Sequence, residues 1–108
     1  MVNEDKKKEY YEMKFDQGKP RWDLVDLKIV EVIAKVLTYG LKDHKANSWK
    51  LVPDAKERYK ASFMRHVADM ISGDPVDEES GLPNSWLAMC NLYFLIWFEQ
   101  NEGDTEWK

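Results

Sequence analysis

A cluster of acidic residues lies in GDPVDEESGLPNS, residues 73–85, directly ahead of the most apolar run in the chain. Asp77, Glu78 and Glu79 are consecutive, so two of these carboxylates can face one point if the segment forms a turn. Mg²⁺ and Mn²⁺ prefer oxygen ligands, typically one or two protein carboxylates together with substrate phosphates and water. The spacing leaves two interpretations open: an ordinary acidic connection between helices, or a loop that holds a divalent cation.

Two other polar residues lie in apolar surroundings. Asn91 falls within WLAMCNLYFLIWF, residues 86–98, and an unpaired buried amide costs roughly 1 to 3 kcal/mol. It therefore either hydrogen-bonds to a neighbouring helix or directs its carbonyl oxygen at a metal or substrate. His66 borders an apolar helix stripe, where it is either a boundary residue with satisfied hydrogen bonds or, with Asp69 three residues later, a ligand of an ion.

Charged residues elsewhere also allow two interpretations. A Gly-Pro turn in residues 13–22 is flanked by residues that could clasp a phosphate: Lys14, Asp16, Lys19 and Arg21. Glu31 either forms an ion pair with Lys35 one turn away or points into a cleft between helices or subunits. Four further residues follow one another at spacings of four, three and four, which would align them on one helix face as a solvated salt-bridge ladder: Arg58, Ser62, Arg65 and Asp69.

The charge is unevenly distributed along the chain. Residues 1–60 carry 14 Lys/Arg against 11 Asp/Glu, whereas residues 61–108 carry 2 against 9. An acidic C-terminal half disfavours nucleic-acid binding, which needs clustered cations. The single cysteine, Cys90, excludes an internal disulfide. No leader-like segment opens the chain and the run at 86–98 is too short to span a bilayer, so we expect a cytoplasmic protein that does not associate with membranes.

Three helices are expected to position these residues. Apolar spacing of three and four predicts a first helix from about Asp23 or Asp26 to Leu41, and a second from Ala55 to about Ser72 with Asp54 as N-cap. A third helix, capped by Asn84 or Ser85 and ending near Gln100, is apolar on nearly every face and should be central and buried. Between the first two, the sequence Asn47-Ser48-Trp49 indicates a turn with an anchoring aromatic side chain.

The expected fold class is all-α, with three main helices in a compact bundle. Residues 13–100 would form one domain between a flexible arm at 1–12 and a flexible tail at 101–108. A domain of this size buries only about two-thirds of the surface of its unfolded chain. Because three helices would cover an all-apolar third helix poorly, we expect a homodimer that completes a four-helix-like bundle.

Several blocks of sequence together carry a family resemblance. In order they are MKFDQGKPRWDL, EVIAKVLTYG, NSWK, ERYKASFMRH, GDPVDEESGLP, and Asn91 ahead of the apolar FL pair. They resemble the phage and prophage family described as dATP/dGTP diphosphohydrolase N-terminal-like, over roughly residues 13–98. The resemblance implies a fold similar to the MazG-like nucleotide pyrophosphatases, which hydrolyse nucleoside triphosphates to monophosphate and pyrophosphate with Mg²⁺ or Mn²⁺.

The resemblance marks the positions of the family's polar motif residues, and from their chemistry we infer roles for particular residues. Glu31, Asp77 and Glu79 would hold the metal, and Glu79 and His66 would act in catalysis. The substrate, a purine (deoxy)nucleoside triphosphate, would be bound by Lys14, Asp16, Lys19, Arg21, Tyr39, Trp49, Arg65 and Asn91, with Tyr39 or Trp49 stacking on the base. The family usually has His after Gly-Leu-Pro, where this chain has Asn84, a change that would weaken catalysis and still offer an oxygen ligand to a metal.

Three functional interpretations follow. The first is a metal-dependent nucleoside triphosphate diphosphohydrolase. The second is a non-catalytic module of phage origin that binds a nucleotide or inhibits a host protein, an interpretation favoured by the missing histidine. The third is a helical interaction protein without a ligand.

Overall fold

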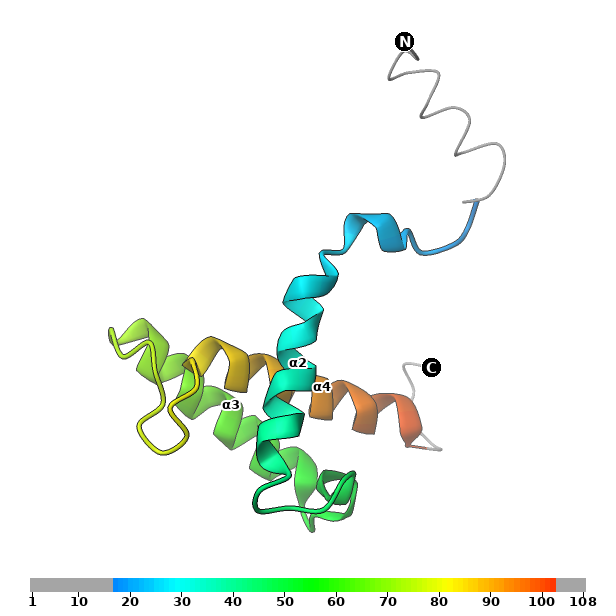
Figure 1. Ribbon diagram of the computed structural model, residues 1–108. Helices are drawn as coiled ribbons and strands as arrows, with labels where there is room; N and C mark the ends of the chain where they lie inside the picture. Colours follow the sequence, from blue (N-terminus) through cyan, green and yellow to red (C-terminus); the bar gives the residue numbers. More distant parts are fainter. Residues whose placement is uncertain (1–16, 103–108) are drawn as a thin grey trace.

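The computed structural model describes residues 17–102, which form an all-α structure (Figure 1). Three α-helices, α2 (Leu27–Gly40), α3 (Ala55–Ile71) and α4 (Asn84–Asn101), are accompanied by two short 3₁₀ helices, η1 (Trp22–Leu24) and η2 (Ser48–Leu51). The all-α class with three main helices is confirmed. Lys14, Asp16 and the arm at 1–12 lie outside the described residues, as does most of the tail, so the domain boundaries stay predictions.

The start of α2 follows the sequence pattern. The carboxylate of Asp26 accepts a hydrogen bond from the backbone N–H of Lys28 at 2.9 Å, which satisfies one of the free donors of the first turn. The helix ends at Gly40, and Leu41 closes it through backbone hydrogen bonds to Thr38 and Tyr39. Asp26, one of the two expected starting points of this helix, is therefore its N-cap.

The starts of α3 and α4 differ from the prediction. Asp54 occupies the N-cap position of α3, but its side chain forms no cap hydrogen bond. Its backbone is left-handed, with φ of 54°, whereas capping side chains normally sit on extended backbone. The N-cap of α4 is Pro83, and no side chain caps this helix. Capping by Asn84 was therefore wrong, because the Asn84 amide makes its hydrogen bonds in the interior instead.

The helix α4 occupies the centre of the fold. It packs against both α2 and α3, while the backbones of α2 and α3 do not approach each other. Figure 1 shows α2 crossing the α3–α4 pair and its N-terminal half projecting beyond them. The predicted central position of α4 is confirmed. The burial of α4 is only partial: Leu92, Tyr93 and Ile96 are 43, 38 and 48% exposed. Two neighbouring helices cannot cover every side of a third.

An aromatic cluster fixes the connection between α2 and α3. Trp49 of η2 stacks on Phe94 of α4 with ring centroids 4.5 Å apart, and it meets Trp97 edge-on at 5.2 Å. The Tyr59 hydroxyl donates a hydrogen bond to the Trp49 backbone carbonyl at 2.9 Å. Asn47 supplies the turn just before η2, with φ of 65°. The predicted turn with an anchoring aromatic side chain is confirmed.

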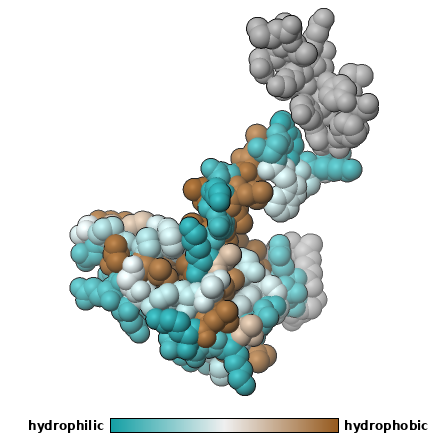
Figure 2. Space-filling model, in the orientation of Figure 1, coloured by the Kyte–Doolittle hydropathy of each residue, from teal (hydrophilic) through white to brown (hydrophobic). Residues whose placement is uncertain are grey.

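The projecting part of the molecule exposes apolar side chains. Figure 2 shows them along the outer part of α2, and Leu24, Leu27 and Ile29 are 74, 64 and 58% exposed. Trp22 in η1 is 73% exposed. Within residues 17–102, no helix combines the length and apolar character needed to cross a bilayer.

Candidate functional site

A cavity lies where α2 and α3 diverge across α4. Its volume is about 470 Å³, and its walls come from the C-terminal half of α2, the connection from Leu41 to Val52, and the facing parts of α3 and α4. Most of the lining is apolar or aromatic, including Leu37, Trp49, Leu87 and Phe94. The polar lining residues from α3 and α4 are Ser62, His66 and Asn91.

A second hollow of about 450 Å³ adjoins this cavity. The two share His44, Tyr59, Ser62 and Asn91 in their linings, and the second adds the side chains of Arg58 and Arg65. We call the two hollows together the groove. Neither arginine forms an ion pair with any residue in the described part of the chain. The expected salt-bridge ladder on this face of α3 is therefore absent from residues 17–102, and both guanidinium groups remain able to bind an anion.

Asn91 joins two helices at the wall of the groove. Its side-chain Nδ2 donates a hydrogen bond to the hydroxyl of Ser62 in α3 at 3.1 Å. The residue is 6% exposed, and its Oδ1 forms no hydrogen bond with a residue between 17 and 102. One end of the amide thus bonds to a neighbouring helix, as the first interpretation expects. The other end is an unused acceptor within the described chain, and its contact with a metal or substrate stays a prediction.

His66 lies at the edge of the cavity and bonds to a buried amide behind it. The distance from its Nδ1 to Oδ1 of Asn84 is 2.8 Å, and Nδ2 of Asn84 donates to the backbone carbonyl of Asp74 at 2.8 Å. Asn84 is 1% exposed and does not line the cavity. Oδ1 of Asn84 already lies against His66 and away from the cavity, and its use as a metal ligand stays a prediction.

The acidic loop between α3 and α4 is internally hydrogen-bonded. Oδ2 of Asp77 accepts from both the backbone N–H and the hydroxyl of Ser80, each at 2.8 Å. Burial acts to raise the pKa of Asp77, but these hydrogen bonds, together with the charge of His66, hold that pKa below its ordinary value. Asp77 thus orders the loop, while Glu78 and Glu79 are exposed.

Comparisons with known proteins place the chain in a family. Residues 9–107 match the family described as dATP/dGTP diphosphohydrolase, N-terminal. The chain belongs to this family. A protein of Salmonella phage PMBT28 named dATP/dGTP diphosphohydrolase is 31% identical over 94 residues, covering 87% of this chain and 32% of the phage protein. The chain therefore spans about a third of that relative's length. No solved structure matches it.

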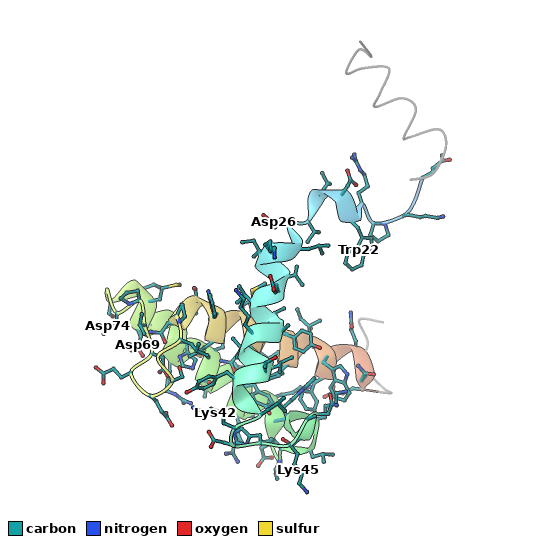
Figure 3. The ribbon with its side chains drawn as sticks, viewed as in Figure 1. Trp22, Asp26, Lys42, Lys45, Asp69 and Asp74 are labelled. Atoms are coloured by element: carbon teal, nitrogen blue, oxygen red, sulfur yellow. The ribbon has the colours of Figure 1, made fainter. Side chains whose placement is uncertain are left out.

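In this member of the dATP/dGTP diphosphohydrolase N-terminal family, two of the expected phosphate ligands lie away from the groove. Lys19 and Arg21 precede α2, which is about 21 Å long at 1.5 Å per residue. Figure 3 shows Trp22 and Asp26 at the outer end of α2 and Lys42 and Lys45 at the opposite end, where the cavity lies. Arg21 also pairs with Asp23 at 2.6 Å. Within one chain, Lys19 and Arg21 therefore lie apart from Arg65 and from the groove.

The expected metal ligands are not gathered either. Glu31 on α2 pairs with Lys28 at 3.4 Å rather than with Lys35, which lies over the ring of Trp86 at 5.3 Å. Within residues 17–102 of one chain, no three His, Cys, Asp or Glu side chains come close enough to hold an ion. In the acidic loop, Asp77, Glu78 and Glu79 are consecutive in the sequence, and Figure 3 shows Asp69 and Asp74 near the end of α3 where this loop begins.

The aromatic residues expected to stack on a base differ in their surroundings. Tyr39 does not line the groove, and its hydroxyl accepts a hydrogen bond from Lys42 at 3.0 Å. Trp49 does line the cavity, although one face of its ring is stacked on Phe94. Stacking on a base stays a prediction for both residues, and Trp49 is the better placed.

The predicted site residues left out several polar residues of the groove, among them Tyr59, His44, Arg58 and Ser62. For the latter two, a signal existed in the helical spacing of Arg58, Ser62 and Arg65, which puts them on one face of α3. His44 carries no comparable signal, since it comes from the connection after α2, whose path depends on tertiary packing.

Proposed function

We propose that the groove binds a (deoxy)nucleoside triphosphate and that the chain takes part in its hydrolysis to monophosphate and pyrophosphate. The observation that supports this most directly is an apolar, aromatic cavity beside two arginines that have no ion-pair partner within residues 17–102. Cavities of about 300 to 1,000 Å³ suit ligands of this size. The name of the phage relative adds the purine deoxynucleotides dATP and dGTP as the first substrates to test.

The groove suggests an orientation for the nucleotide. The base would lie among the apolar residues, with Trp49 or Phe94 beside it and the Oδ1 of Asn91 as an acceptor. The phosphates would lie against Arg58 and Arg65, because guanidinium groups form charge-assisted, often bidentate, hydrogen bonds to phosphate oxygens. Within one chain, Arg58 thus takes the role expected of Lys19 and Arg21 as a phosphate ligand, and Arg65 keeps the role expected of it.

His66 is the residue best placed for proton transfer. In the proposed step, a water oxygen forms a bond to the α-phosphorus, the bond from that phosphorus to the departing pyrophosphate breaks, and a proton of the water passes to Nε2 of His66. General-base catalysis of this kind contributes roughly 10² to 10⁴-fold in rate. Glu79, exposed in the acidic loop, is the other candidate base.

We propose Mg²⁺ or Mn²⁺ as the cofactor, arriving with the nucleotide. A full cage of protein ligands is not required, since such ions typically take one or two carboxylates and complete their shell with phosphates and water. Asp77, whose Oδ1 forms no hydrogen bond within the described chain, and Glu79 would supply them. When bound, the ion would neutralise charge on the phosphates. Glu31 could join only by a change in the position of α2 or from a second chain.

We further propose that the chain forms a homo-oligomer. Contiguous exposed apolar surface on a protein of this size commonly marks an interaction site. The side chains of Trp22, Leu24 and Leu27 offer such a surface at the projecting end of α2.

The decisive experiment measures binding and turnover separately. Calorimetric titration with dGTP and dATP in the presence of Mg²⁺ or Mn²⁺ should show binding, and an Arg58→Gln/Arg65→Gln double variant should bind at least about tenfold more weakly. Lys60→Gln is the matched control, because Lys60 lies on the same helix, outside the groove, and pairs with Glu57. It should leave affinity unchanged.

Pyrophosphate release is then assayed with all eight common nucleotides. Release that depends on the metal and falls in Glu79→Gln or His66→Gln supports the enzyme. Binding without release of pyrophosphate from any nucleotide would make the chain a nucleotide-binding module, the second interpretation. Absence of binding to every nucleotide would overturn the proposed function.

A further inference from the structure

We infer that Asn84 is the positioning residue of His66: it holds the proton on Nδ1 and leaves Nε2 as the nitrogen that acts toward the groove. The inference about the proton rests on hydrogen bonds alone. Its consequence for catalysis rests on the proposed function. The family resemblance suggested that Asn84, in place of a histidine, weakens catalysis. The hydrogen bond between Asn84 and His66 instead supports a role in orienting the histidine.

The direction of the Asn84 amide is fixed by its partner. Asn84 Nδ2 lies 2.8 Å from the backbone carbonyl oxygen of Asp74. A carbonyl oxygen only accepts hydrogen bonds, so the atom facing it must be the amide nitrogen. The other end of the amide, Oδ1, therefore faces His66.

The direction of the amide in turn fixes the histidine. Oδ1 of Asn84 lies 2.8 Å from Nδ1 of His66, and an amide oxygen is an acceptor without a proton to give. Nδ1 must then carry the proton. The opposite tautomer would set two lone pairs against each other inside a buried contact, where an unsatisfied polar group costs roughly 1 to 3 kcal/mol.

The backbone around Asn84 makes this contact rigid. The Asn84 backbone N–H donates to the carbonyl of Pro75 at 2.8 Å, and the Asp74 N–H donates to the carbonyl of Asp69 in α3 at 2.9 Å. Asn84 thus links both ends of the acidic loop to the helix that carries His66. Its side chain, 1% exposed, has no room to rotate away into solvent.

The remaining nitrogen is available to a ligand. His66 lines the cavity and Asn84, the partner of Nδ1, does not. From this we infer that the ring edge carrying Nε2 faces the open space. Nε2 forms no hydrogen bond with any residue from 17 to 102. In the neutral ring Nε2 can accept a proton from water, and in the charged ring its N–H can donate to a phosphate oxygen. Both actions use the orientation that Asn84 sets.

The tautomer can be read without nucleotide by ¹⁵N NMR of histidine-labelled full-length protein at a pH where the ring is neutral. We expect His66 to show a protonated Nδ1 and an unprotonated Nε2. His44 is the chain's other histidine, and its side chain forms no hydrogen bond within the described residues, so it serves as the internal reference. A wild-type His66 with its proton on Nε2 would overturn the inference, whatever the enzyme assay shows.

Two variants extend the test. Asn84→Asp keeps an acceptor for Nδ1 and should retain the wild-type tautomer, whereas Asn84→Ala removes the acceptor and should lose it. If the alanine variant does not fold, as circular dichroism would show, the wild-type and aspartate spectra still decide the matter. Loss of the Nδ1 proton in Asn84→Asp, or its full retention in a folded Asn84→Ala, contradicts the inference.

The catalytic consequence has its own measurement. If pyrophosphate release is detected, Asn84→Ala should lower kcat about 100-fold with KM changed little, because the misplaced base acts in the reaction step rather than in binding. A rise in KM with unchanged kcat would show that Asn84 serves binding instead. A protein without any hydrolysis would refute the proposed function and leave the NMR result as it stands.

Discussion

The side chains of Asn91 in α4 and Ser62 in α3 are joined by a hydrogen bond of 3.1 Å at the wall shared by both hollows of the groove. A hydrogen bond of this kind contributes roughly 0.5 to 1.5 kcal/mol to stability. We therefore expect Asn91→Ala and Ser62→Ala to be non-additive, with a coupling energy of about 1 kcal/mol in a double-mutant cycle measured by urea unfolding. Strict additivity of the two changes would show that the contact is not energetically significant.

The thiol of Cys90 should be unreactive in the folded protein. Burial raises the pKa of Cys90 from 9.0 to about 12, and the residue is 2% exposed. Since the thiolate is the reactive form, its fraction at pH 8 falls roughly 1,000-fold. Labelling with an aromatic disulfide reagent at pH 8 should be slow in buffer and rapid in urea, where the same thiol is exposed. Stoichiometric labelling within seconds in the absence of urea would contradict this.

Acid stability should depend on Asp77. Its pKa is depressed below 3.8, so the folded state holds its proton less readily than the unfolded state. The stabilisation is therefore present above about pH 4 and is lost as the pH falls through the depressed value. We expect Asp77→Asn to flatten the decline of the urea midpoint below pH 4. Glu78→Gln, which removes a neighbouring carboxylate and leaves the Ser80 hydrogen bonds intact, should keep the wild-type slope.

The exposed end of α2 should govern self-association. Leu24 and Leu27 are 74 and 64% exposed, and replacing both with Glu should convert the proposed oligomer to a monomer in light-scattering measurements, with helix content unchanged. Leu51 in η2 is 83% exposed at the other end of α2, so Leu51→Glu is the control and should leave the oligomer intact. A wild-type protein that is already monomeric would remove the basis for this interface.

The helices were predictable from the sequence because local signals define them. Asp26 begins α2 as a side-chain cap, and the apolar spacing through Leu37 places its inner face. The start of α4 was not predictable in the same way. Asn is a common N-cap residue, yet the amide of Asn84 hydrogen-bonds instead to His66 and Asp74, which lie 18 and 10 residues away in the sequence. Such partners depend on how the loop folds back onto α3.

Groove residues that lie on one helix face could be predicted from the sequence, whereas residues that come together only through the fold could not. His66, Arg65 and Asn91 line the groove, and their roles there stay predictions. Arg21 and Glu31 carry suitable charges, but the length and direction of α2 take them away from it. The sequence pattern does not define that direction. Within residues 17–102, α2 packs against α4 and has no helix on its other side that would fix its orientation.

The divergence of α2 from α3 also determines how the molecule would respond to an occupant. One wall of the cavity, α2, is held by α4 and not by α3, so its opening involves fewer contacts than global unfolding. A ligand that touches Leu37 on one wall and Ser62 on the other bridges two helices whose backbones do not approach each other. Backbone amides of α2 should then exchange with deuterium more slowly once the ligand is bound. In this fold the substrate itself would become part of the packing between α2 and α3.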